Sequence, residues 1–220
     1  MKKNILTAIL IVASIVTSFS QKVITKKLDV QGKKVEMKFD FADSIRIEAW
    51  NKNTVELEVS VNIENNRFNE YYKLNENSFS GDIDWVEKID FEAIKKIKGT
   101  GNNCNFDKMI RYKLKVPANL EFSLKTIAGQ IILEGSLGKM SVNSISGFID
   151  YAVPASMKAR INLSTVTGDV YSNLTFDKSG SKEMSWVGTK RDLTLNSGSL
   201  PIKLETVSGN IYLRKAKQLN

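Results

Sequence analysis

The sequence has no histidine, one cysteine and three prolines among its 220 residues. Without histidine it has no Ser-His-Asp or Cys-His nucleophile system, no imidazole base and no imidazole ligand for zinc or iron. One cysteine cannot make a disulfide within the chain, a CxxC redox pair or a cysteine-based zinc site. Catalysis by this sequence would have to use carboxylates, lysine or tyrosine.

Positive charge is in excess, but it is spread along the chain. Lysine and arginine number 32 against 24 acidic residues, which gives a net charge of +8. The densest blocks are Lys95-Lys96-Ile97-Lys98 and Arg214-Lys215-Ala216-Lys217, a pattern more typical of solvated surface charge than of an anion site. No nucleic-acid module accompanies the charge, so nucleic acid is not an expected partner.

The first twenty residues have the pattern of a signal peptide. Lys2 and Lys3 precede an apolar stretch from Ile5 to Val16, and Ser18 and Ser20 place small residues before a cleavage site. This stretch is shorter than the roughly 20 residues that span a bilayer, although an uncleaved anchor is the alternative. We expect an exported mature chain without a transmembrane span, in the periplasm, on the outer-membrane surface or outside the cell.

The single cysteine, Cys104, lies in a glycine- and asparagine-rich segment, residues 99–105. It has no partner cysteine in the chain and no obvious activating base or cation. It is interpreted as a tolerated loop thiol or as one half of an intermolecular disulfide.

Four segments of the C-terminal half repeat one motif: an apolar residue, any residue, Ser or Thr, Ile or Val, a small residue, Gly, any residue, and Ile or Val. The motif glycines are 18, 21 and 41 residues apart. The last interval is close to two periods, so residues 172–199 are either a degenerate copy or an inserted loop. The glycines are Gly129, Gly147, Gly168 and Gly209.

Within each copy, the side-chain alternation of an extended chain changes at one place. The first apolar residue and the Ser or Thr share one face, whereas the following Ile or Val, the Gly and the last Ile or Val share the other. Both sets reach one core only if the chain bends between them, with the Gly supplying a special backbone angle or room for a neighbour. We therefore predict a corner there and a ladder of hydroxyl side chains, namely Thr126, Ser144, Thr165 and Thr206.

Repeats of roughly 20 residues made of strands and turns predict an all-β, single-stranded β-solenoid with one coil per copy. An antiparallel β-sandwich or meander is the less favoured alternative, because the change of alternation recurs at one motif position. We expect residues 21–220 to form one domain, in which strands of 21–116 cap or extend the repeat coils of 117–215.

Alternating apolar residues predict further strands at 34–41, 44–50, 55–63 and 107–116. Residues 65–80 are polar and predict a surface loop or an edge hairpin. Residues 84–98 have apolar residues at helical spacing, and Asp84 with Glu87 resembles a capping box. A short helix that ends at Gly99 is therefore expected over 84–98.

The string Lys113-Leu114-Lys115-Val116-Pro117, the four motif copies and the ending Ser208-Gly209-Asn210-Ile211-Tyr212-Leu213-Arg214-Lys215 resemble a known family. It is the β-strand-repeat family of unknown function called "putative adhesins", which is common among exported proteins of the Bacteroidetes. The resemblance covers residues 110–215 and is weaker over 21–63. It implies a β-solenoid at the cell envelope, it implies no enzyme activity or cofactor, and it assigns no functional residue.

Two aspartates support the alternative of a polysaccharide-processing enzyme. Asp150 and Asp169 occupy nearly equivalent places in neighbouring copies, and paired carboxylates can share protons or a calcium ion. The other copies have Gln130 and Asn210 in place of Asp169, and the calcium-binding nonapeptide of other repeat proteins is absent. Outward-facing polar residues are the favoured interpretation, so no catalytic residue, cofactor or metal ligand is expected.

Two tyrosines support a third function, glycan binding. Tyr171 and Tyr212 each follow a motif glycine by three residues, so they are expected on one outer face, as in sugar-stacking platforms. Covering a hydrophobic face would explain them equally well. The favoured function is a non-catalytic, adhesin-like or structural module of the cell envelope. Its expected partners are an envelope or extracellular polysaccharide, an anionic surface or another envelope protein.

Overall fold

The computed structural model describes residues 21–30, 32–79, 82–99, 106–179 and 188–217. The expected signal peptide and Cys104 lie outside the described residues. The described chain forms two β-sheets, here called the first and second sheet, and one short α-helix, α1 (Phe91–Lys98). A single 3-10 turn, Asn69–Tyr71, precedes β5.

The two sheets are open and face each other across one core along the molecule. In spatial order the first sheet contains β1 (Lys22–Asp29), β4 (Thr54–Ile63), β7 (Lys108–Pro117), β3 (Ser44–Trp50), β9 (Gln130–Glu134), β11 (Ile149–Val153), β17 (Ile211–Lys215) and β13 (Val170–Ser172). The second contains β14 (Lys178–Ser179), β15 (Thr189–Leu195), β12 (Ala159–Thr167), β16 (Leu200–Ser208), β10 (Met140–Ser146), β8 (Phe122–Thr126), β2 (Val35–Lys38), β6 (Asp82–Ile89) and β5 (Tyr72–Phe79).

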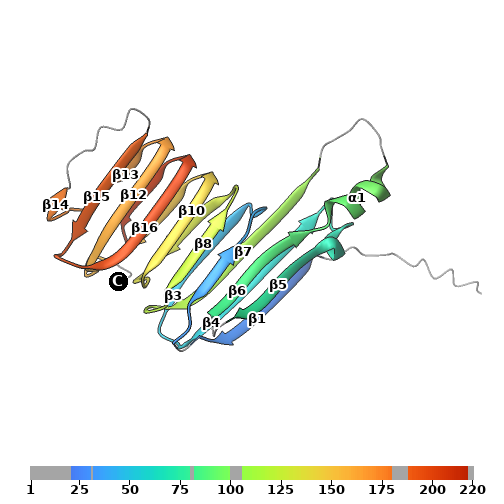
Figure 1. The fold of residues 1–220 in the computed structure, drawn as a ribbon, viewed down its shortest axis with the longest axis horizontal. Coiled ribbons are helices and arrows are strands. Elements are labelled where there is room, and N and C mark those ends of the chain that lie inside the picture. The colour runs from blue at the N-terminus through green and yellow to red at the C-terminus, as the bar shows by residue number, and fades with distance from the viewer. Residues whose placement is uncertain (1–20, 31, 80–81, 100–105, 180–187, 218–220) are drawn as a thin grey trace, which may run out of the picture.

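The strands stack along the longest axis of the molecule, with β14 and β15 at one end and β1, β5 and α1 at the other (Figure 1). Alternate residues of each strand are buried, and those of both sheets form one hydrophobic cluster. Period-two burial against a facing sheet is what the alternating sequence pattern predicts. The strands predicted at 44–50, 55–63 and 107–116 are present, the one predicted at 34–41 is present over Val35–Lys38 only, and β1 is an additional strand.

Each motif copy contributes one strand to each sheet, and strands of neighbouring copies pair in parallel. With their strands included, we number them copy 1 (122–134), copy 2 (140–153), copy 3 (159–172) and copy 4 (200–215). The copies do not stack in chain order, because copy 4 lies between copy 2 and copy 3 in both sheets. A solenoid whose coils follow one another along the chain is therefore not confirmed, and the parallel pairing also differs from the antiparallel sandwich.

Two N-terminal segments extend this parallel stack without carrying the motif. In the second sheet β2 pairs with β8 of copy 1 on one edge and with β6 on the other. In the first sheet β3 pairs with β9 of copy 1 on one edge and with β7 on the other. Helix α1 lies in the chain between β6 and β7. Antiparallel strands then end both sheets: β4 and β1 beside β7, β5 beside β6, and β15 with β14 beside β12.

The predicted hydroxyl ladder is present on the inside of the corner. Ser144 lies in register with Thr126 on one side and Thr206 on the other, and Thr165 follows Thr206. All four side chains are buried, and each donates a hydrogen bond to a corner carbonyl, as when Ser144 Oγ donates to the oxygen of Ser146 at 2.8 Å. The ladder therefore satisfies backbone oxygens that the bend removes from the sheet hydrogen bonds.

The prediction that the first Ile or Val of the motif faces the core is wrong. These four residues are exposed by 40–53%, because the chain bends one step later, at the small residue and the Gly. The alternation of the incoming strand therefore continues through the Ile or Val and turns it outward. The exposed residues are Ile127, Ile145, Val166 and Val207.

The two isoleucines of copy 2 should consequently differ in their effect on stability. Ile149 is 0% exposed and Ile145 is 53% exposed. We expect Ile149→Ala to lower the free energy of unfolding by about 2–5 kcal/mol, and Ile145→Ala by less than about 1 kcal/mol. Urea unfolding of both variants measures this, and equal losses would contradict the outward placement of Ile145.

The predicted helix over 84–98 is correct only in its second half. Residues 84–89 belong to strand β6, and the helix starts at Phe91 with Asp90 as its N-cap, whose carboxylate accepts a hydrogen bond from the Ala93 N–H. Asp84 and Glu87 therefore form no capping box. The helix ends at Gly99, as predicted. The predicted edge hairpin at 65–80 contains β5, which pairs antiparallel with β6 at the edge of the second sheet.

Both ends of the molecule are closed by strands that differ from the motif. Residues 189–195 form β15, which runs antiparallel to β12, so this part of 172–199 is not a degenerate parallel copy. At the opposite end, Lys22 of β1 donates from Nζ to the carbonyl oxygens of Asn69 and Tyr72, and Lys26 forms an ion pair with Glu76 of β5. Lysines on the half-buried face of a terminal strand disfavour continued pairing with another chain.

Candidate ligand face

The outer surface of the first sheet carries a row of three aromatic side chains on adjacent strands, here called the aromatic row. Phe148 precedes β11, Tyr212 lies on β17 and Tyr171 lies on β13. Tyr171 and Tyr212 are directly in register. The placement of the two tyrosines on one outer face, which their equivalent motif positions predict, is therefore seen in the structure.

The rings of the aromatic row contact one another. Tyr171 and Tyr212 are stacked, with ring centroids 5.3 Å apart and planes 13° apart, and Phe148 approaches Tyr212 edge-on at 6.1 Å. Tyr171 is 49% exposed, whereas Tyr212 is partly covered by its two neighbours. Such a stack holds large apolar surfaces in fixed positions while leaving the outermost ring accessible.

Polar groups border the aromatic row on both sides. The Tyr171 hydroxyl donates to Asp169 Oδ2 at 3.3 Å, and the Asn210 amide donates to the Tyr212 hydroxyl at 3.1 Å. The charge of Asp169 raises the pKa of the Tyr171 hydroxyl, so this phenol remains a neutral donor. On the other side, Arg214 Nε contacts both carboxylate oxygens of Asp150, at 2.6 and 2.9 Å.

A shallow depression lies along β17 between these groups. Phe148 and Asp150 border it at the start of β11, and residues 171–173 border it at the end of β13, with Tyr212 and Arg214 between them. An aromatic surface next to hydrogen-bonding side chains is suited to ligands that have both apolar C–H faces and hydroxyl groups.

The expected proximity of Asp150 and Asp169 is not found. Copy 4 lies between copies 2 and 3, so Tyr212 is the neighbour of Asp150 and Asn210 is the neighbour of Asp169. Asp150 is also held in its ion pair with Arg214. Within the described part of the chain, no group of three or more potential metal-binding side chains occurs.

The motif glycines form a column along the corner, in the order Gly129, Gly147, Gly209, Gly168. A Cβ on each would lie within 3.0 Å of the preceding carbonyl oxygen in the column, which for Gly129 belongs to Ala42. Gly129, Gly147 and Gly209 also have positive φ angles of +117°, +105° and +150°. Both reasons predicted for glycine, the special backbone angle and the close approach, therefore apply.

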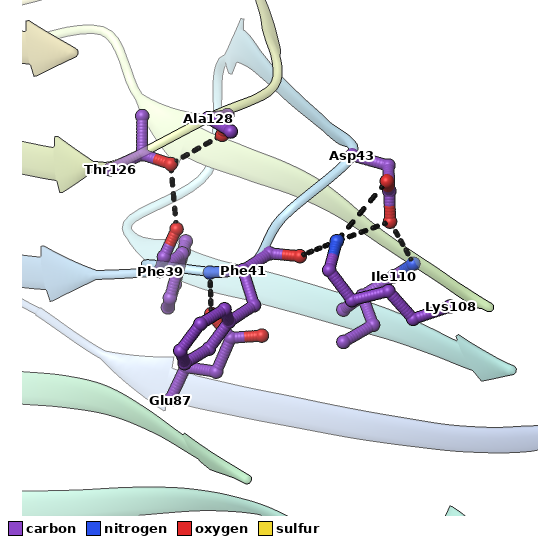
Figure 2. Close-up of polar contacts among 8 residues, drawn as sticks. All are labelled: Phe39, Phe41, Asp43, Glu87, Lys108, Ile110, Thr126 and Ala128. Atoms are coloured by element: carbon purple, nitrogen blue, oxygen red, sulfur yellow. Dashed lines mark hydrogen bonds and ion pairs between the residues drawn. The ribbon is translucent and has the colours of Figure 1, made fainter. Parts of the chain in front are cut away.

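A second polar cluster, which the sequence interpretation missed, holds the corner between β2 and β3 (Figure 2). The Phe41 N–H donates to Glu87 Oε2 at 2.7 Å, and Lys108 Nζ donates to the Phe41 oxygen at 2.7 Å. Lys108 also pairs with Asp43, whose carboxylate accepts from the Ile110 N–H. These contacts replace the glycine packing at a corner that lacks the motif.

Glu87 is the buried member of this cluster. It lies on the inner face of β6, and its Oε1 atom is buried without a hydrogen-bond partner. Burial raises the pKa of Glu87 to about 7, against the opposing influence of the Phe41 N–H, the nearby Tyr112 hydroxyl and Lys108. Tyr112 in turn hydrogen-bonds Tyr72 at 2.8 Å. Glu87 is enclosed between the sheets, whereas Lys108 and Asp43 lie at the partly exposed rim of the corner. The contacts of the cluster join backbone groups of the corner, so they are structural.

Scans against family models and curated proteins give no match. Solved structures that match include a "putative cell adhesion protein" from Clostridium sporogenes ATCC 15579, with 12% identity, a TM-score of 0.56, and coverage of 89% of this chain and 100% of that chain. A "putative adhesin" from Bacteroides fragilis NCTC 9343 has 10% identity, a TM-score of 0.34 and coverage of 89% and 98%. One from Parabacteroides distasonis ATCC 8503 has 14% identity, a TM-score of 0.28 and coverage of 69% and 61%.

At these identities the comparison concerns the fold alone. The clostridial protein has a fold similar to that of this chain over nearly the whole of both chains. In the described residues, no helix is long and apolar enough to cross a membrane.

Proposed function

We propose that this chain is an exported, non-catalytic protein of the cell envelope that acts as an adhesin-like binding module. In this proposal the four copies and the 35–50 segment form a short β-solenoid with one coil inserted out of order, and the aromatic row is its ligand face. The leader pattern of residues 1–20 supports export. The similarity in fold to a "putative cell adhesion protein" is consistent with the role.

The observation that carries the proposal is the stacked pair Tyr171 and Tyr212. Large aromatic rings are costly to leave in water, and a fold with a continuous core does not need them outside it. Here they are aligned by two strands and bordered by Asp169 on one side and the Asp150–Arg214 ion pair on the other. Saccharides present the matching combination of apolar C–H faces and hydroxyls, so an envelope or extracellular polysaccharide is the proposed ligand.

The alternative of a polysaccharide-processing enzyme has less support. Its two candidate carboxylates are separated by β17, and Asp150 is engaged by Arg214. Two carboxylates that cleave a glycosidic bond must flank it from a shared cleft. We therefore expect polysaccharides incubated with the protein to gain no new reducing ends.

The proposal is tested by substituting tyrosines of the aromatic row and measuring the binding of polysaccharides and lipid vesicles. Mature protein, residues 21–220, is screened against envelope polysaccharides and anionic lipid vesicles, and cell fractionation determines where the protein is located. The double variant Tyr171→Ser with Tyr212→Ser should lose at least about tenfold in affinity for a polysaccharide ligand, because the stacking surface is removed.

A matched control uses two exposed apolar residues at the other end of the same outer face, Val23→Ser with Met109→Ser. This variant should bind as the unchanged protein does. The proposal fails if the double tyrosine variant binds polysaccharide normally with an unchanged melting temperature. It also fails if the protein binds the lipid vesicles and not the polysaccharides, or if the protein remains in the cytoplasm.

A further inference from the structure

The stacking within the aromatic row limits how a saccharide can use it. Tyr171 and Tyr212 cover one ring face of each other, and Phe148 approaches Tyr212 from its other side. β13 is the last strand of the first sheet in the described residues, so the second ring face of Tyr171 is turned toward the end of the sheet. A sugar ring can therefore stack on Tyr171 alone. Tyr212 packs against the opposite face of the Tyr171 ring and holds that ring in place.

A hydrogen-bond acceptor lies beside this ring. Asp169 is exposed, and its Oδ2 atom accepts from the Tyr171 hydroxyl. The Asp169 N–H donates to Asn210 Oδ1 at 2.9 Å, which fixes the backbone that carries the carboxylate. Oδ1 of Asp169 accepts no hydrogen bond from any described residue, so it is available to a hydroxyl group of a ligand stacked on Tyr171.

The charges around Tyr171 distinguish between kinds of sugar. The ionised group in contact with Tyr171 is the Asp169 carboxylate. Arg214, the cation that borders the aromatic row, is already bound through Nε to both oxygens of Asp150. A carboxylate on the sugar would therefore meet an uncompensated negative charge at Asp169, and like charges in contact repel.

Resting on the proposed function, we infer that the ligand face binds one neutral pyranose unit. Its apolar C–H face packs on the outward ring face of Tyr171, and its hydroxyls donate to Asp169. The site is small and open, so one unit binds with a dissociation constant on the order of millimolar. Strong attachment to a polysaccharide surface then requires several copies of the protein acting together.

The test uses saturation-transfer NMR and calorimetry on mature protein with named probes. Methyl glycosides of glucose, galactose, mannose and N-acetylglucosamine represent neutral sugars, and glucuronate and galacturonate represent acidic ones. At least one neutral probe should bind at least about tenfold more tightly than either acid. Asp169→Asn should weaken that probe about fivefold or more and reduce the discrimination against acids, because the carboxylate is removed.

Three further variants make the result specific to this geometry. Tyr171→Ala should abolish binding of the neutral probe, whereas Tyr212→Leu should weaken it less, because Tyr212 only supports the stacked ring. Asp192→Asn, which changes an aspartate on the outer face of the second sheet, should have no effect. Melting temperatures confirm that each variant is folded, and Asp169→Asn replaces a side chain by one of equal shape.

The outcomes separate this inference from the proposed function. Tighter binding of the acids, or full neutral binding by Asp169→Asn, overturns the inference, while loss of polysaccharide binding in the double tyrosine variant would still support the proposed function. Absence of binding by every monosaccharide probe also overturns the inference. A protein that binds no polysaccharide at all overturns both.

Discussion

Replacing Gly147 by alanine should lower the free energy of unfolding by at least about 4 kcal/mol, which for a chain of this size is a fall of roughly 8–16 °C in melting temperature. Gly147 has a φ of +105°, and a Cβ there would overlap the carbonyl oxygen of Gly129. That oxygen lies in the short corner between β8 of the second sheet and β9 of the first, so it cannot move without disturbing the parallel pairing on either side. Calorimetry or urea unfolding measures the loss.

Gly32 provides the control for the backbone angle. Its φ is +72°, but a Cβ there would meet nothing within 4 Å. Gly32→Ala should therefore cost only about 1 kcal/mol, which is the strain of the left-handed conformation alone. If the two variants lose equal stability, then the close packing of the glycine column is not what makes Gly147 necessary.

The stability of this protein should fall as pH rises from about 4.5 to about 7, through one buried group. The pKa of Glu87 is raised in the folded protein to about 7 from an ordinary value of 4.5. Within this interval the folded state binds more protons than the unfolded state, so raising the pH favours unfolding. The resulting loss in free energy of unfolding is absent below pH 4.5 and complete above pH 7, where it amounts to about 3 kcal/mol.

Glu87→Gln isolates this contribution. The amide oxygen can still accept from the Phe41 N–H, and the side chain no longer ionises. Above pH 7 the variant should melt roughly 6–12 °C higher than the unchanged protein, and near pH 4 the two should melt together. Glu92→Gln, at an exposed site on α1, should follow the unchanged protein at every pH. A constant difference between Glu87→Gln and the unchanged protein would contradict titration of Glu87.

The local geometry of the motif could be predicted because the same residue pattern occurs in each of the four copies. A hydroxyl residue before a small residue and a Gly, repeated four times, predicted that Ser144 would align with its equivalents. The same equivalence placed Tyr171 beside Tyr212. Such alignments depend on a period of two and on the parallel pairing of like segments.

The order of the copies could not be predicted in the same way. Every copy presents similar strand edges. The motif therefore predicts the register in which two copies pair, but it does not predict which two copies are neighbours. The alternative catalytic site depended on chain order, since it needed Asp150 and Asp169 in adjacent copies. Copy 4 separates them and brings Arg214 to Asp150 instead.

The misplaced helix has a different cause, a charged residue at a buried position. Ile83, Trp85, Glu87 and Ile89 all face the core, but the glutamate interrupts the apolar alternation that identifies a strand. The remaining apolar residues of this region then match helical spacing. Carboxylates are rarely buried, so no local pattern indicated that Glu87 would be enclosed between the sheets.

The position of copy 4 also has consequences for folding. Copy 3 precedes copy 4 in the sequence, yet in the finished stack it contacts copy 2 only through copy 4. Until copy 4 is inserted, β10 of copy 2 and β12 of copy 3 each present an unpaired strand edge, the kind of edge that recruits other chains. A folding intermediate in which copies 1 to 3 have formed must therefore stay open between copies 2 and 3, and the parallel stack becomes continuous only when copy 4 enters it.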